Sequence, residues 1–198
     1  MVITNESRSH LLAADMYRLL SAGLSYPDNE MLKSVESLTT ELLKENELPA
    51  GVIAKLQAFA GELNDERIAA EYSRIFIQGG VPVTESHTVT SFNSVSDVAA
   101  FYAAFGFEAK SGESPDSIMY ELEFMALLNI KIAIAPNQEA RSVTFEAYHD
   151  FLKEHLLEFS QKFSKKILSG DAIPYFKLLC ELLVIFVEGE AMLAEGEN

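Results

Sequence analysis

The sequence is poor in cysteine and in basic residues. Cys180 is the single cysteine among 198 residues, so the chain cannot form an internal disulfide. The 15 Lys and Arg against 30 Asp and Glu give a net charge of −15. This charge argues against direct binding to nucleic acid or to an anionic membrane, because either contact would add repulsion without releasing counterions. It favours a cationic partner, although a role in solubility alone is also compatible with it.

Long apolar segments are missing as well. The most apolar stretch, 178–187, contains Cys180 and is interrupted by Glu181. It has about half the length that a bilayer requires, and we expect a buried, unreactive thiol within it. Residues 1–10 are polar and lack the apolar centre of a signal peptide. These absences predict a soluble, cytoplasmic protein without stable membrane insertion.

Motifs of known catalytic chemistry are scarce. Gly79-Gly80 is not followed by the Lys-Ser/Thr of a phosphate-binding loop, and no histidine lies near Cys180 in the sequence to activate it. Glu146 and His149 have the spacing with which helical bundles build di-iron sites, but the 4 histidines provide no second pair of this kind. We therefore expect no cofactor and no enzyme activity. A helical metal-binding protein or enzyme that uses Glu146 and His149 is the alternative.

Helical periodicity is what the chain has in abundance. Apolar residues make up 48% of the sequence and recur at helical spacing, whereas no segment reads convincingly as a strand. We predict an all-α protein, a single multi-helix bundle over residues 1–198. Two halves, 1–106 and 114–198, joined by the linker 107–113, are the alternative organisation. The predicted helices cover 7–24, a segment capped by Asp28 that reaches residue 42, 52–63, 64–76, 94–105, 114–135, 139–168, and a last helix from 171 with a frayed acidic tail from Gly189.

Residues 79–93 interrupt this pattern. Gly79-Gly80, Pro82 and a mixture of Thr, Ser and Val show no helical period, which predicts an exposed loop. A loop of roughly fifteen residues without regular structure is unusual inside a compact domain. Its length favours a functional role.

The helix of residues 114–135 has the strongest start signals. Ser114 is a suitable N-cap, Pro115 suits the first helical position, and Asp116 complements the helix dipole. The residues that follow are apolar around much of the helix, which predicts a buried, central helix whose polar start opens toward solvent or a ligand. The apolar positions are Ile118, Leu122, Phe124, Met125, Leu127, Leu128 and Ile132.

Three ionisable side chains lie on apolar helices. Glu121 and Glu123 flank Leu122 at about 100° to either side, so they do not form a paired site by themselves. A lone buried carboxylate is costly, and we expect at least one of the two to have a partner if the helix is buried. His155 is expected to pack with one ring nitrogen satisfied locally.

Several segments, taken in order, resemble one known family. Phe-Tyr-Ala-Ala-Phe-Gly-Phe at 101–107, Ser-Pro-Asp-Ser-Ile at 114–118 and Glu-Leu-Glu-Phe-Met at 121–125 are similar to the TorD/DmsD/NarJ family of cytoplasmic chaperones for exported molybdoenzymes. Residues 16–21 before Tyr26-Pro27, 71–76 with Glu85-Ser86, and 151–156 with Phe163 match further family segments. Ser117 stands where the family usually has histidine, Phe159 replaces a usual tryptophan, and the loop after Phe76 lacks the family's Gly-Pro and Pro-Pro pairs. These departures indicate a divergent branch.

The resemblance implies a chaperone for a molybdopterin-containing oxidoreductase of the DMSO, TMAO or nitrate reductase type. It would bind the twin-arginine leader, the apo catalytic subunit or both until the cofactor is inserted, as a monomer or homodimer. In this hypothesis an apolar wall, a loop rim at 79–86 and a polar end receive the leader; gripping only the mature part of the client is the alternative. The candidate binding residues are Tyr17, Tyr72, Ile75, Phe76, Gly79, Pro82, Glu85, Ser86, Pro115, Asp116, Ser117 and Glu121.

Overall fold

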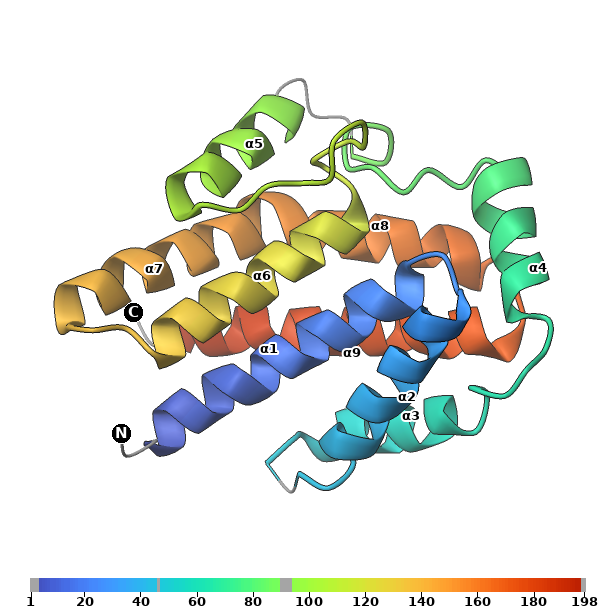
Figure 1. Ribbon diagram of the computed structural model, residues 1–198, viewed down its shortest axis with the longest axis horizontal. Helices are drawn as coiled ribbons and strands as arrows, with labels where there is room; N and C mark the ends of the chain where they lie inside the picture. The colour runs from blue at the N-terminus through green and yellow to red at the C-terminus, as the bar shows by residue number, and fades with distance from the viewer. Residues whose placement is uncertain (1–3, 46, 90–93, 197–198) are drawn as a thin grey trace.

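The computed structural model describes residues 4–45, 47–89 and 94–196. Within these ranges all regular secondary structure is helical, which confirms the predicted all-α fold. Figure 1 shows α1 (Asn5–Leu24) crossing the front of the molecule, with α2 (Asn29–Leu42) and α3 (Ala50–Ala60) below it. The side chain of Asp28 accepts hydrogen bonds from the amides of Glu30 and Met31, so the predicted cap of α2 is also confirmed.

The next helix begins later than predicted. Residues 64–67 form a turn, because Asp65 Oδ1 accepts the backbone amide of Arg67 at 2.9 Å before α4 (Ile68–Tyr72) starts. The π-helical segment η1 (Ser73–Gln78) continues α4. At Gly79 an added Cβ would lie 2.5 Å from the carbonyl oxygen of Arg74, so only glycine fits where η1 ends.

The second part of the chain largely follows the predicted pattern. It contains α5 (Ser94–Phe105), α6 (Ile118–Ala133), α7 (Gln138–Phe151), the π-helical η2 (Leu152–Leu156), α8 (Leu157–Leu168) and α9 (Pro174–Gly196). The predicted helix of residues 139–168 corresponds to α7, η2 and α8 in direct succession. The predicted fraying from Gly189 is wrong: α9 continues to Gly196, because Ala194 is buried and Tyr148 donates a hydrogen bond to Glu190.

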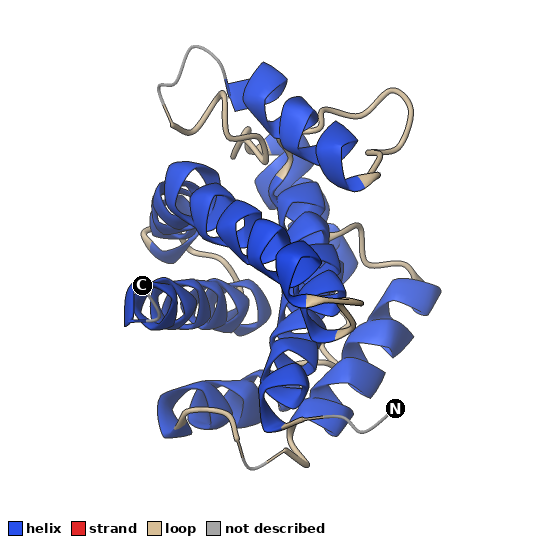
Figure 2. Ribbon diagram, turned by 90° about the vertical axis from the view of Figure 1, so that its left-hand side faces the viewer, coloured by secondary structure: helices blue, strands red, loops and turns tan. Residues whose placement is uncertain are grey.

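Helices from both parts of the chain share one core. α1 lies along α6 and also touches α9, while α9 packs against α3 and α8. Figure 2 shows the same helices from the side, crossing one another in layers. Large aromatic side chains fill the centre, and burial of each contributes roughly 1.5–3 kcal/mol relative to an exposed position. The fully buried aromatic residues include Tyr17, Phe59, Phe124, Phe151, Phe159, Phe163, Tyr175 and Phe176.

Cys180 is buried in this core on α9. Its expected burial is confirmed, and this burial raises the pKa of the thiol to about 12. No helix in the described part of the chain is both long and apolar enough to cross a bilayer.

Candidate functional site

The long loop is docked onto the start of α6, and its described part is not the exposed loop that the sequence predicted. The amide of Ile118 donates to the carbonyl of Val83 at 2.8 Å, and the amide of Glu85 donates to the carbonyl of Asp116 at 2.8 Å. Thr84 and Ser117 face each other as an isolated antiparallel bridge. We call residues 81–89 the cover segment. Predicted loop residues 90–93 lie outside the described residues.

Helix α6 starts three residues later than predicted, since Ser114 is not its N-cap. The Ser114 hydroxyl donates to the carboxylate of Asp116, and the other oxygen of Asp116 accepts the amide of Ser86 at 2.9 Å. Ser117 is the N-cap, without a side-chain capping bond. Pro115 therefore precedes the helix, and its carbonyl accepts a hydrogen bond from Tyr102 at 2.9 Å. Asp116 is used to hold the loop rather than to complete the first turn.

The predicted polar opening of this helix toward solvent is wrong. Asp116 and Glu121 are 0% exposed, Glu85 is 1% and Ser117 is 4% exposed. The cover segment contacts Asp116 and Ser117. We call the group Glu85, Asp116, Glu121 and His155 the acidic junction.

Glu121 is the unusual member of the acidic junction. Neither of its carboxylate oxygens has a hydrogen-bond partner among the described residues. Glu121 and Glu123 flank Leu122. Of these two glutamates, only Glu123, at the surface, has a side-chain hydrogen-bond partner, the hydroxyl of Ser21 at 3.4 Å. Burial above all, and then the charges of Glu85 and Asp116, raise the pKa of Glu121 well above its ordinary value. A protonated carboxyl avoids the larger cost of burying a charge there.

His155 was expected to be satisfied locally, but its partner lies 70 positions away. Its Nδ1 is 3.1 Å from Glu85 Oε2, and both side chains are almost completely buried. Nε2 has no partner within the described ranges. The rings of Phe151 and Phe101 lie 4.9 Å and 5.8 Å from the imidazole. Spacing alone gave no signal that this residue belongs to the site.

Tyr102 completes the surroundings of the acidic junction. Burial first, and then the carboxylates of Glu121 and Asp116, raise its pKa far above the ordinary value for tyrosine. Its hydroxyl therefore keeps its proton and remains a donor to the carbonyl of Pro115.

The predicted apolar wall is more enclosed than expected. Tyr72 and Ile75 are buried, and Phe76 is half-buried with its ring stacked on Phe163 at 6.1 Å. Exposed apolar atoms at this end come from Tyr26, whose ring lies 5.5 Å from that of Tyr72, and from Ile77, which is 66% exposed.

A buried carboxylate anchors this wall to the last helix. Glu71 accepts hydrogen bonds from the Arg74 guanidinium at 2.7 Å and from the amide of Ile173 at 3.0 Å. The hydrogen bond from Arg74 is the main cause that lowers the pKa of Glu71. On the rim, Gly79 is exposed, whereas Pro82 and Ser86 are partly buried.

Tyr17 is not placed at this site. Its side chain is 0% exposed and contacts Phe186 at a ring distance of 4.9 Å and the hydroxyl of Tyr148 at 3.4 Å. These contacts are to α9 and α7 rather than to the cover segment. Tyr17 is a core residue in this conformation.

A second feature, which the sequence did not indicate, is an open apolar cavity of about 540 Å³ between α1, the start of α3 and the end of α9. We call it the apolar groove. Met192 and Leu193 on its edge are 73% and 65% exposed. Further apolar lining comes from Leu12, Leu48, Val52 and Ile185.

Glu146 and His149 line a different cavity of about 380 Å³, together with Glu6 and Arg141. His149 Nδ1 lies 3.4 Å from Asp150. In the parts of the chain that are described, no three His, Cys, Asp or Glu side chains gather closely enough to hold a metal ion.

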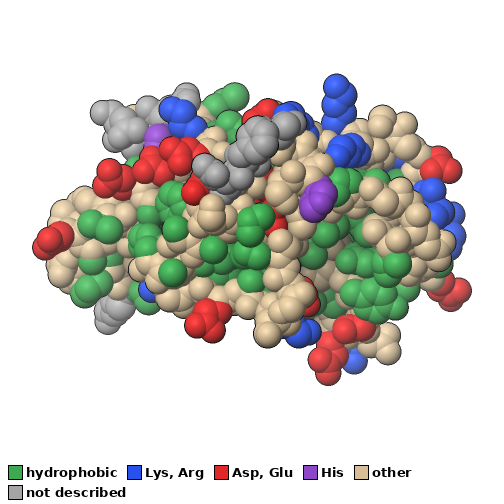
Figure 3. Space-filling view, turned by 90° about the horizontal axis from the view of Figure 1, so that it is seen from above, with side chains coloured by type: hydrophobic (Ala, Val, Ile, Leu, Met, Phe, Trp, Pro, Cys, Tyr) green, Lys and Arg blue, Asp and Glu red, His purple; other side chains and the backbone are tan. Residues whose placement is uncertain are grey.

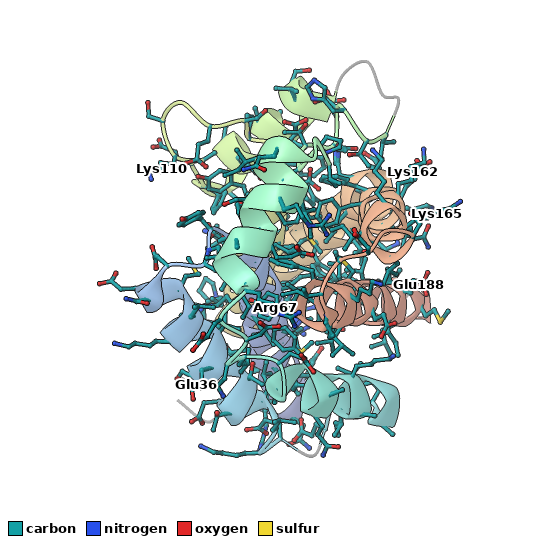
Figure 4. The ribbon with its side chains drawn as sticks, turned by 90° about the vertical axis from the view of Figure 1, so that its right-hand side faces the viewer. Glu36, Arg67, Lys110, Lys162, Lys165 and Glu188 are labelled. Carbon is teal, nitrogen blue, oxygen red and sulfur yellow. The ribbon has the colours of Figure 1, made fainter. Side chains whose placement is uncertain are left out.

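Two further views show side chains on the surface of the molecule. Figure 3 looks onto the side of α5 and shows exposed hydrophobic side chains beside acidic ones. In Figure 4, Lys162 and Lys165 of α8 project outward at the edge of the molecule.

The described residues form an all-helical bundle with a loop docked onto the start of α6. The sequence pattern of the nitrate reductase delta subunit family matches residues 45–165. The chain belongs to this family, whose members are chaperones for the maturation of molybdoenzymes, and the resemblance seen in the sequence is thereby confirmed. No curated protein matches the chain.

Proposed function

We propose that the chain is a cytoplasmic, non-catalytic chaperone that binds the twin-arginine leader of a molybdenum-containing reductase of the DMSO, TMAO or nitrate reductase type. It holds the apo catalytic subunit until the cofactor has been inserted and so prevents premature export. Membership of a molybdoenzyme chaperone family supports the general role. The leader-binding role is our extension of it.

The observation that carries this extension is the convergence of three carboxylates. Glu85 comes from the cover segment, whereas Asp116 and Glu121 come from the start of α6, and His155 is the only basic side chain paired with any of them among the described residues. A twin-arginine leader is cationic at one end and apolar beyond it. Guanidinium groups form strong, paired hydrogen bonds with carboxylates, and the apolar part requires a hydrophobic surface.

The apolar part of the leader would contact the end of the molecule formed by Tyr72, Ile75 and Phe76. The amide of Val81 donates to the carbonyl of Ile75 at 3.2 Å, so the segment that carries Glu85 begins against this wall. This contact supports a site in which the apolar wall and the acidic side chains are neighbours.

Calorimetric titration with a twin-arginine peptide tests this site. We expect Asp116→Asn and Phe76→Ala each to weaken binding, the first by removing a charge and the second by removing part of the wall. Asp97→Asn, which removes an exposed carboxylate from α5, is the matched control and should bind as the unmodified protein does. Unchanged affinity in both site variants would contradict the site.

Binding of the mature part of the client is the second candidate function, favoured by the open apolar groove. Its exposed Met192 and Leu193 suit a partly folded apolar segment. A pull-down that compares leaderless and full-length apo-subunit separates the two candidates. Leader-independent capture that Leu193→Glu abolishes would favour the groove.

A further inference from the structure

The acidic junction is closed, although the proposed leader contact requires it to be open. Asp116 and Glu121 are 0% exposed, and Asp116 is hydrogen-bonded to Glu85 and Ser86 of the cover segment. The client can reach Glu85 and Asp116 only if the cover segment leaves its place. The contacts that hold this segment therefore control access.

Few contacts hold the cover segment to α6 and η2. Backbone bonds join Val83 to Ile118 and Glu85 to Asp116, and the amide of Ser86 is bound by the Asp116 carboxylate. The amide of Val81 donates to the carbonyl of Ile75, and Val81, Val83 and Val89 pack against the core. Among the described residues, the side-chain contact that ties this segment to η2 is that of Glu85 with His155 at 3.1 Å. Its removal would leave the segment held by these backbone bonds and valine contacts.

We propose that His155 is a positioning residue whose contact with Glu85 holds the cover segment closed over the acidic junction, and that a client arginine opens it by pairing with the same carboxylates. This inference rests on the proposed function and adds its regulation. The closed form is a resting state, and the open form is the one that binds.

The closed form leaves several polar atoms unsatisfied. Both carboxylate oxygens of Glu121, Nε2 of His155 and Oγ1 of Thr88 are buried and have no partner among the described residues. Buried polar groups without partners destabilise the arrangement that encloses them. Opening would give these atoms access to water or to a ligand, so the closed and open forms can be close in free energy.

An arginine fits the opened junction better than the imidazole does. His155 offers one ring nitrogen to Glu85, whereas a guanidinium carries five donors in a planar arrangement that matches carboxylate oxygens. Glu85 and Asp116 are near enough to Glu121 for their charges to act on it. A client arginine can therefore satisfy oxygens that the closed form leaves without partners.

Thiol labelling measures the opening directly. Ser117 is 4% exposed beneath Thr84, and its hydroxyl has only a 3.4 Å contact with the sulfur of Met119, so Ser117→Cys introduces a thiol that reacts only after the cover segment opens. Cys180 in the core is the internal reference for global unfolding. We expect the Ser117→Cys thiol to react faster than Cys180, with little dependence on urea, since a local opening exposes little surface.

We call the contact between Glu85 and His155 the latch. Variants of these two residues test whether the latch holds the cover segment closed. His155→Leu in the Ser117→Cys protein should raise labelling at residue 117 about tenfold, the effect of losing one hydrogen bond to a charged group. Glu85→Gln, which alters the other partner of this contact, should also raise labelling at residue 117. His155→Asn keeps a donor near the position of Nδ1 and should raise labelling less.

A core substitution provides the matched control. Val35 is fully buried in α2, which packs on α1 and α3, and it stays packed whether the cover segment is open or closed. Val35→Ala should therefore speed labelling of Cys180 but not of residue 117. If His155→Leu and Glu85→Gln leave labelling at residue 117 unchanged, or if that labelling depends on urea as steeply as that of Cys180, the inference is overturned.

Hydrogen exchange with a twin-arginine peptide tests the second half of the inference. The amides of Glu85 and Ser86, which are bonded in the closed form, should exchange faster when the peptide is bound, and a peptide with glutamines in place of the arginines should have no effect. Peptide binding that slows this exchange overturns the inference and leaves the proposed function standing. Absence of peptide binding, with faster labelling in His155→Leu, refutes the proposed function and leaves the latch standing.

Discussion

The acidic junction and the apolar groove reverse the usual distribution of polar and apolar groups. The junction buries three carboxylates, whereas the groove exposes Met192 and Leu193 to solvent. Folded proteins normally bury apolar side chains and expose charged ones. Both regions therefore lower the stability of the fold. The acidic junction does so because its acidic groups are removed from water, and the apolar groove does so because apolar area stays exposed. The difference is that the first region is closed by a loop, whereas the second is already open.

The two regions also differ in how the chain builds them. The groove lies between regular helices, so its shape is set by the packing of α1, α3 and α9. The junction depends on a segment without helical structure that is held by a few named contacts. Substitutions should therefore have large effects on folding at the junction and small ones at the groove.

The largest effect is expected for His155→Leu. It removes the imidazole from the Glu85 carboxylate, and loss of a hydrogen bond to a charged group costs about 1.5 kcal/mol, which corresponds to the tenfold rise in labelling expected above. Urea denaturation at pH 7 measures the loss. An unchanged free energy of unfolding would mean that this pair contributes nothing to the closed junction.

A gain in stability is expected for Glu121→Gln. Because the pKa of Glu121 is raised in the folded protein, its contribution is fully present below the unfolded pKa of about 4.3 and is lost as pH rises toward the folded value. The amide does not titrate, so the variant should match the unmodified protein near pH 4 and exceed it by on the order of 1 kcal/mol at pH 7.

Urea denaturation across this pH range checks the sign. Glu36→Gln, at an exposed carboxylate of α2 visible in Figure 4, is the control and should leave the profile unchanged. A parallel profile for Glu121→Gln and the unmodified protein would show that Glu121 is not the cause of the pH dependence.

The smallest effect on folding is expected in the apolar groove. Leu193→Glu should change the free energy of unfolding by no more than about 0.5 kcal/mol, because an exposed side chain loses little packing. The same change should reduce binding of a fluorescent apolar dye. A large loss of stability would mean that Leu193 is packed in solution and that the groove is not open.

Local patterns in the sequence predicted much of the fold. The bounds of α5, the cap at Asp28 and the succession from α7 to α8 follow from spacing and capping residues that lie within a few positions of one another. The predicted start of α6 was wrong because the side chain of Asp116 binds the amide of Ser86, 30 positions away. No local pattern reveals that competition.

The candidate site was predicted less well for the same reason. Glu85, Asp116 and Glu121 were predicted to belong to the site, but the burial of Glu85 and Asp116 follows from contacts between distant segments. The contact of His155 with Glu85 was not predicted because the two residues are distant in sequence. The groove was missed because Met192 and Leu193 fall in a tail that was expected to fray.

The two π-helical segments have a consequence for rotational phase. A π-helical turn contains more residues than an α-helical turn, so each residue after it is rotated relative to an uninterrupted α-helix, where one residue corresponds to about 100°. His155 lies within η2, and η1 ends directly before the chain turns toward the cover segment. The widened turns therefore set the direction in which the imidazole faces Glu85 and the direction in which the loop departs. Deletion of a single residue from either segment would rotate one side of the latch away from the other.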